Sequence, residues 1–96
     1  MNQGISKELL RQLRNDIPIE GLICRFLDIE RKYSEGYLRF LCPICYEFNT
    51  ATKKETNLAR CFRCRKNFNP IDMVMAHCGL EFLETVQFLT PILQRR

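Results

Sequence analysis

Two short cysteine motifs decide the fold of this chain: Cys42-Pro43-Ile44-Cys45 and Cys61-Phe62-Arg63-Cys64, separated by fifteen residues. Each motif lets both thiolates of one tight turn point at a single ion. The second pair completes the tetrahedron that Zn²⁺ takes in structural sites. The interval between the pairs matches that of four-cysteine zinc sites. The sequence therefore predicts one structural zinc ion, with its coordination closed by Cys42, Cys45, Cys61 and Cys64.

Disulfide bonds, a redox motif and an iron–sulfur cluster are the other roles open to these thiols. Disulfides suit secreted chains, but the N-terminal residues include no apolar stretch typical of a signal peptide, so we expect reduced thiols and a cytoplasmic protein. Two pairs at this interval are less typical of a redox motif than of a metal site. Four thiolates also hold iron–sulfur clusters, and spacing alone leaves that alternative open.

Positive charge is concentrated around the cysteine motifs. The net charge of the 96 residues is +4, and residues 37–66 alone hold seven basic and two acidic side chains. Residues 1–36 are neutral overall, and residues 67–96 carry a net −1. Solvated side chains explain many charge runs, but here aromatic residues alternate with the basic ones. That combination favours a nucleic-acid surface. No stretch approaches the ~20 apolar residues of a membrane span, so we expect no membrane partner.

Helices are predicted at both ends of the chain. Ser6 can cap a helix over residues 6–14, and Pro18 suits the first turn of a second one. An apolar stripe follows in that second helix, where Gly21 suggests close packing. After the cysteine motifs, Asn69 can cap a helix that Gly79 ends, with Cys78 expected in its buried stripe and His77 partly exposed. A last helix begins near residue 81, and Thr90-Pro91 is expected to end or kink it.

Between the helices the pattern predicts about three short antiparallel strands, at residues 37–41, 49–52 and 56–60. A turn at residues 33–36 precedes them, and a polar loop at residues 53–55 joins the last two. The predicted fold class is α+β: a small zinc ribbon flanked by N-terminal and C-terminal helices packed on one face. The length suits a single domain over residues 1–96.

The order of these features resembles the N-terminal zinc-binding domain of bacterial DnaG-type DNA primases. The resemblance rests on Ile17-Pro18-Ile19, Leu41-Cys42-Pro43, the second cysteine motif, and Gly79-Leu80 followed by Phe82-x-Glu84-x-Val86. It covers roughly residues 16–92, which leaves residues 1–15 as an N-terminal helical extension. In that family the domain reads single-stranded DNA template and presents it to a separate catalytic domain.

The resemblance therefore implies a DNA-binding face on the ribbon. Basic side chains would neutralise phosphates and exposed aromatic rings would stack on bases. For each residue taken singly, a solvated charge or a core aromatic is an equally good interpretation. The candidate phosphate contacts are Arg39, Lys53, Lys54, Arg60, Arg63 and Lys66, and the candidate stacking residues are Tyr37 and Phe62.

Three departures from the family pattern stand out. The second ligand is usually histidine, and here it is Cys45. The glycines around the last cysteine are replaced by Arg63, Arg65, Asn67 and Phe68. The chain also stops where a primase would continue into its polymerising core.

These residues predict a protein that is not itself an enzyme. Nucleotide transfer uses metal ions held by several carboxylates. The one close acidic pair is Asp28 and Glu30, and a solvated helix end explains it better than a catalytic metal site does.

The leading hypothesis is a zinc module that binds single-stranded DNA and acts with a primase, polymerase or helicase chain in trans. One alternative is an adaptor or regulator that docks a polymerase, helicase or recombinase without reading DNA. Double-stranded DNA or RNA binding in transcription control is the remaining alternative.

Overall fold

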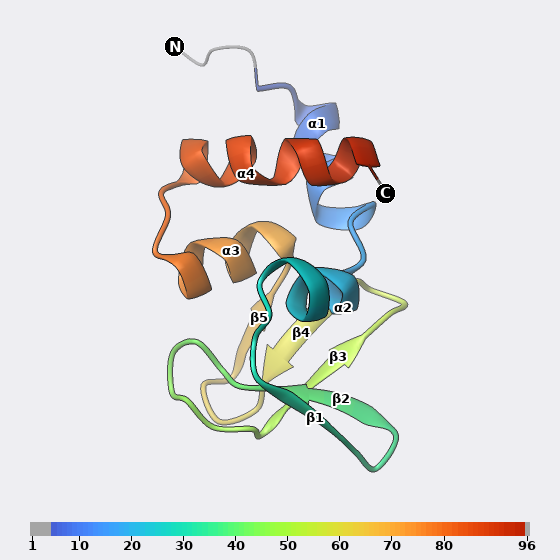
Figure 1. Cartoon of the computed structure of the whole chain (residues 1–96), viewed down its shortest axis with the longest axis vertical. Helices are drawn as coiled ribbons and strands as arrows, with labels where there is room; N and C mark the ends of the chain where they lie inside the picture. The colour runs from blue at the N-terminus through green and yellow to red at the C-terminus, as the bar shows by residue number, and fades with distance from the viewer. Residues whose placement is uncertain (1–4, 96) are drawn as a thin grey trace.

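The computed structural model, which describes residues 5–95, has an α+β arrangement in which helices from both ends of the chain pack together and two small antiparallel sheets lie on one side of them (Figure 1). None of the helices within residues 5–95 is long and apolar enough to cross a membrane. The elements are α1 (Lys7–Asn15), α2 (Ile19–Gly21), the π-helical turn η1 (Leu22–Phe26), β1 (Arg31–Ser34), β2 (Tyr37–Phe40), β3 (Thr50–Lys53), β4 (Leu58–Cys61), β5 (Lys66–Phe68), α3 (Pro70–Cys78) and α4 (Phe82–Arg95).

The N-terminal helices follow their predicted signals only in part. Ser6 caps α1 by accepting a hydrogen bond from the Leu9 amide, as predicted. The second helix is shorter than the apolar stripe suggests: one turn of α2 passes into η1, where the Leu27 amide donates to the carbonyl of Leu22, five residues back. The close packing predicted at Gly21 is wrong, because a Cβ atom there would meet nothing within 4 Å.

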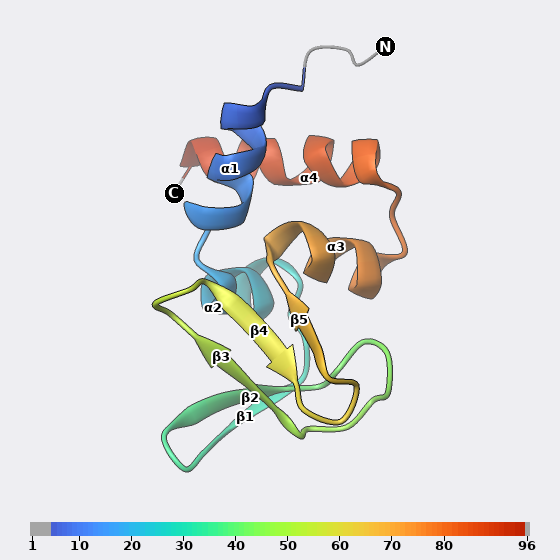
Figure 2. The same ribbon diagram turned by 180° about the vertical axis from the view of Figure 1, so that it is seen from behind.

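The strands form two sheets rather than the single ribbon of about three strands that the sequence suggested. Strand β2 pairs with β1 in a hairpin, and β3, β4 and β5 form a separate sheet with β4 in the middle (Figure 2). The hairpin turn places Glu35 and Gly36 at positive φ, which fits the turn predicted there. Strand β1 is largely exposed and lacks the alternation that marks a half-buried strand.

Thr50 joins the two sheets through its side chain. Its hydroxyl accepts a hydrogen bond from the Phe40 amide at 2.8 Å and donates one to the Phe40 carbonyl at 2.7 Å. The Arg39 guanidinium donates to the Thr50 carbonyl at 2.8 Å. These bonds fix β2 against β3 where no backbone ladder connects them.

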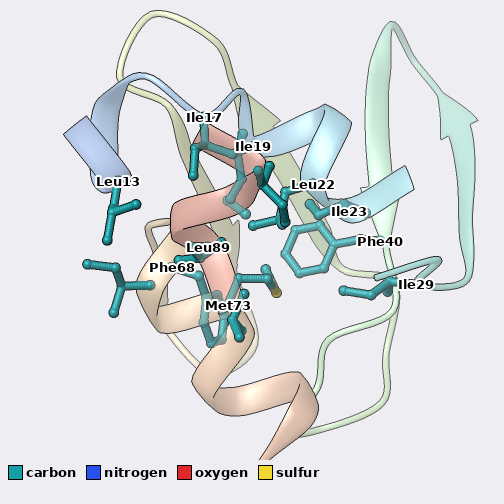
Figure 3. Packing of buried hydrophobic residues seen from close by; sticks show 14 of the residues in the cluster. Leu13, Ile17, Ile19, Leu22, Ile23, Ile29, Phe40, Phe68, Met73 and Leu89 are labelled. Atoms are coloured by element: carbon teal, nitrogen blue, oxygen red, sulfur yellow. The ribbon is translucent and has the colours of Figure 1, made fainter. Parts of the chain in front are cut away.

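The hydrophobic core lies between the sheets and the helices (Figure 3). Phe40 from β2 and Phe68 from β5 meet edge to face, with ring centroids 6.4 Å apart. Met73 of α3 and Leu89 of α4 are fully buried with them. The core therefore supports both sheets from one side, as predicted, and leaves their other face to solvent.

The two C-terminal helices agree with the sequence prediction at the start and end of α3 but not at the end of α4. Asn69 and Asp72 form a capping box at the start of α3, and Gly79 ends it at φ 68°. Helix α4 does not end at Thr90-Pro91 but continues to Arg95. The Thr90 hydroxyl donates to the Val86 carbonyl, and the packing of buried Ile92 and Leu93 outweighs the lost proline N–H.

Asn57, which the sequence analysis did not single out, ties the ribbon to the N-terminal helices. It lies in the turn between β3 and β4 with φ 55°, a conformation that asparagine tolerates better than most residues. Its side-chain amide donates to the carbonyls of Arg14 and Ile17, and its oxygen accepts from the Ile19 amide, each at 2.8 Å. One side chain therefore satisfies three backbone groups between α1 and α2.

We predict that Asn57→Ala lowers the free energy of unfolding of the zinc-loaded protein by about 2–4 kcal/mol, because three hydrogen bonds are lost. Asn57→Gly removes the same bonds but relieves the positive φ, so it should be less destabilising by about 1 kcal/mol. Urea denaturation followed by circular dichroism measures both. Equal stability of Asn57→Ala and the unmodified protein would contradict this role.

Candidate metal centre and nucleic-acid interface

The four motif cysteines converge on one point. All four Sγ atoms lie within 4.8 Å of one another. The Sγ atoms of Cys42 and Cys64 are 3.9 Å apart, and those of Cys45 and Cys61 are 3.6 Å apart. A tetrahedron with Zn–S bonds of about 2.3 Å has edges of about 3.8 Å. The donor set and its spacing fit one zinc ion.

The backbone of each motif is shaped to hold thiolates. The Ile44 amide points at Cys42 Sγ at 3.4 Å, and the Cys64 amide points at Cys61 Sγ at 3.3 Å. The residue after each motif reverses the chain in the left-handed region: Tyr46 has φ 60° and Arg65 has φ 57°. Two similar turns thus face each other across the metal position.

In the metal-free protein, the pKa values of the motif thiols shift in different directions. Burial raises the pKa of Cys42, and burial together with the neighbouring thiols raises that of Cys64 to about 12. Burial also acts on Cys61, but the Cys64 amide and the other thiols outweigh it and lower the pKa of Cys61. Protons must therefore leave when zinc binds.

The geometry decides between the alternatives that spacing left open. The 3.6 Å between Cys45 and Cys61 is far from a disulfide bond of about 2.05 Å, and all six cysteines are free. In a four-iron cluster each cysteine binds a different iron atom, so its sulfurs spread wider than the edges of a one-ion tetrahedron. The cluster of cysteines is a structural zinc site.

The single histidine, His77, and the two other cysteines, Cys24 and Cys78, lie outside this cluster. Among residues 5–95, the four motif cysteines are the group of side chains close enough to share a metal ion. His77 is exposed near the end of α3, as predicted. Cys78 is exposed rather than buried, which corrects its place in the apolar stripe, and Cys24 is half-buried in η1.

A groove of about 860 Å³ runs over the solvent face of the strands beside the metal centre. Residues from β2, β3 and β4, from the turn between β3 and β4, and from the second cysteine motif line it. Six of the eight predicted nucleic-acid contacts lie in this groove: Tyr37, Arg39, Lys53, Lys54, Arg60 and Phe62.

The two arginines of the groove already have protein partners. Arg39 donates to Thr50 and to the Glu35 carboxylate at 2.7 Å, and it stacks over the Tyr37 ring. Arg60 donates to the Asn67 side chain at 3.1 Å and lies over the Phe62 ring. The half-buried Arg39 braces the groove wall, and both arginines hold an aromatic ring in place.

The lysines and aromatic rings of the groove are more available to a ligand. Lys53 is exposed, and Lys54 is 80% exposed with a single ion-pair distance of 4.0 Å to Glu20. The rings of Tyr37 and Phe62 are 51% and 47% exposed.

Two predicted contacts lie outside the groove. Lys66 is exposed at the start of β5 and does not line the groove. Arg63 lies at the tip of the second motif, 3.7 Å from the Glu47 carboxylate.

The groove is also lined by an acidic residue, Glu20 of α2. Sequence reasoning missed it because Thr52, whose hydroxyl donates a hydrogen bond to Glu20, lies 32 residues away.

The family follows from the comparison with known proteins. The profile of the CHC2 zinc finger, the zinc ribbon of DnaG, matches residues 5–95. The chain belongs to this family. DNA primases of Listeria monocytogenes and Listeria innocua are each 31% identical to it over 87 residues, which is 86% of this chain. The chain spans 13% of the length of these curated relatives.

Membership in the CHC2 zinc finger family makes the second ligand distinctive. Cys45 stands where the family usually has histidine, and its Sγ atom lies in the cluster with the other three sulfurs. Zinc accepts four thiolates as readily as three thiolates and an imidazole. The metal centre of this member is therefore all-sulfur.

We predict that Cys45→His keeps one zinc ion per chain, because a Cys₃His set also satisfies the tetrahedron. Cys45→Ala should lose its zinc to a chelator and unfold, since three ligands leave the site open. Cys24→Ser, outside the cluster, is the matched control and should keep its zinc. Zinc content after gel filtration measures the three variants, and a zinc-free Cys45→His protein would count against this geometry.

We also predict that zinc affinity rises with pH. Cys42 and Cys64 keep their protons at neutral pH in the metal-free fold, so binding must release at least two. The affinity should fall by roughly a hundredfold for each pH unit on going from about pH 8 to about pH 6. Chelator competition at several pH values measures it, and a pH-independent affinity would refute the assignment of protonated thiols.

Proposed function

We propose that this zinc ribbon binds single-stranded DNA template in the groove over its strands and acts in priming beside a separate catalytic chain. The observation that carries the proposal is the groove, which gathers six of the eight residues that the sequence predicts as nucleic-acid contacts. Membership in the DnaG zinc-ribbon family supports a role in DNA replication and priming.

The groove offers both kinds of contact that a single strand requires. Lys53 and Lys54 provide exposed ammonium groups for phosphates, and Arg60 adds a guanidinium beside Phe62. Two half-exposed aromatic rings, Tyr37 and Phe62, can each stack on a base for about 1–3 kcal/mol. Duplex DNA hides its base faces, so the exposed rings favour single strands.

The proposed role does not include catalysis by this chain. Asp28 and Glu30 are exposed, and Asp28 pairs with Arg31 at 3.3 Å. Within residues 5–95, the four cysteines are the one group placed to hold a metal ion, and a closed structural site provides no position for a nucleotide. Nucleotide transfer would fall to a primase or polymerase chain in the same cytoplasmic complex, with a helicase as a further partner.

Fluorescence anisotropy tests the proposal directly. Zinc-loaded protein is titrated into labelled single-stranded DNA, double-stranded DNA and RNA of equal length at two salt concentrations. Tighter, salt-sensitive binding to single-stranded DNA supports template binding. Preference for duplex DNA or RNA, or no binding to any of the three, would refute it.

We predict that Lys53→Ala/Lys54→Ala weakens single-stranded DNA binding by roughly tenfold at low salt and lowers the salt slope by about 1.4, because two phosphate contacts are lost. Arg63→Ala/Lys66→Ala removes the same charge outside the groove, so its loss should be much smaller. Zinc content should remain at one ion per chain in both. Equal losses in the two variants would indicate nonspecific attraction to a basic surface.

An adaptor that docks a polymerase or helicase is the second candidate. One observation favours it: a separate notch of about 320 Å³ lined by apolar Ile17, Leu22, Phe26 and Ile92 and flanked by Arg25 and Arg95. Phe26 is 40% exposed there. Absence of nucleic-acid binding in the titration would shift attention to this notch.

A further inference from the structure

The groove is lined by two carboxylates, Glu20 and Glu55, as well as by basic side chains. Glu20 of α2 lines the groove together with Lys53, Lys54 and Arg60, and its side chain is 29% exposed. A negative charge at this point repels phosphate and weakens general attraction to DNA. A groove built only to attract phosphates gains nothing from it.

The structure holds Glu20 in one orientation. The hydroxyl of Thr52, a buried residue on β3, donates to Glu20 Oε2 at 2.5 Å. Lys54 Nζ is 4.0 Å from the other oxygen, Oε1, and remains largely exposed. Each carboxylate oxygen accepts two hydrogen bonds, so both oxygens keep capacity for a ligand in the groove.

Glu55 lines the same groove and provides a comparison. It is exposed in the turn between β3 and β4, and no hydrogen bond or ion pair anchors it among residues 5–95. A free carboxylate of this kind can swing away from an approaching strand. Glu20 cannot do so without giving up its bond to Thr52, which makes Glu20 the better candidate for a fixed contact.

A fixed carboxylate that shares a groove with two exposed aromatic rings can select a base by its pattern of hydrogen-bond donors. Unstacked bases present their Watson–Crick edges to a protein. Guanine is the base with two adjacent donors on that edge, N1–H and N2–H, which match the two carboxylate oxygens. Adenine and cytosine place a ring-nitrogen acceptor beside their amino group, and thymine places its one N–H between two carbonyls.

We propose that Glu20 is a specificity residue that selects guanine in the single-stranded template. This inference rests on the proposed single-strand binding and adds a base preference to it. In this arrangement Glu20 accepts from N1–H and N2–H of one splayed guanine, Tyr37 or Phe62 stacks on a base, and Lys54 turns to the neighbouring phosphate. Thr52 is the positioning residue that keeps the carboxylate facing the groove.

The test uses zinc-loaded full chain and labelled oligothymidylates that carry a single central guanine, adenine, cytosine or hypoxanthine. The guanine oligonucleotide should bind roughly tenfold more tightly than plain oligothymidylate, in line with a bidentate contact. Hypoxanthine lacks the N2 amino group and should fall between guanine and the others. Adenine and cytosine should give little gain.

Two matched variants assign the preference to one residue. Glu20→Gln keeps an oxygen that can accept from Thr52, but it replaces the other carboxylate oxygen with an amino group that donates. The variant should therefore abolish the guanine gain, which is the increase in affinity that a central guanine gives over plain oligothymidylate. Glu55→Gln removes the same charge from the same groove and should keep the guanine gain. Both variants should bind plain oligothymidylate as tightly as the unmodified protein or somewhat more tightly, since a repulsive charge is removed.

The outcomes separate this inference from the proposed function. Binding to every single strand with no guanine gain overturns the role of Glu20 and leaves template binding intact. A guanine gain that survives Glu20→Gln also overturns it, because another group must then read the base. No binding to any oligonucleotide overturns both proposals. A guanine gain lost in Glu20→Gln and kept in Glu55→Gln supports the assignment.

Discussion

The coordination of one zinc ion by four thiolates is the interaction on which the rest of the structure depends. Cys42 follows β2, and Cys61 ends β4, so the metal ties the β1–β2 hairpin to the three-stranded sheet. Elsewhere the two sheets are joined by the hydrogen bonds around Thr50 and by the contact between the Phe40 and Phe68 rings. Structural zinc contributes roughly 10–16 kcal/mol of apparent binding energy, as much as the whole stability of a typical domain. The groove between these sheets exists because the metal holds them together.

Metal coordination also offsets backbone strain beside the site. Tyr46 and Arg65 adopt positive φ directly after the two motifs, where each costs of order 1–3 kcal/mol. At the second of these positions the DnaG-type pattern has glycine, which adopts that conformation freely. The strain is small beside the zinc contribution, so the chain can keep a long side chain at each turn.

The sequence anticipated the parts of the fold that have local signals. Cysteine spacing, the caps Ser6 and Asn69 and the glycine at the end of α3 all act through neighbours in the chain, and each was placed correctly. Strand β1 was missed because its pairing with β2, not its own pattern, makes it a strand. Asn57 and Glu20 were missed for a related reason: their partners lie about 30–40 residues away, and no local pattern records such a contact. The groove likewise became visible only when six scattered residues proved to share one face.

Only part of the positive charge around the cysteines lies in the groove. Four thiolates and one Zn²⁺ carry a net charge of −2, one unit more negative than the three-thiolate, one-histidine site of the family. Arg63 and Arg65 stand beside the last ligand, where the family has glycines. Arg63 is 3.7 Å from the Glu47 carboxylate, and neither Arg63 nor Arg65 lines the groove, whereas Lys53, Lys54 and Arg60 do. The basic residues around the cysteines therefore divide into those that line the groove and those that lie outside it. The net charge of +5 on residues 37–66 overstates the number of cations available to a bound strand.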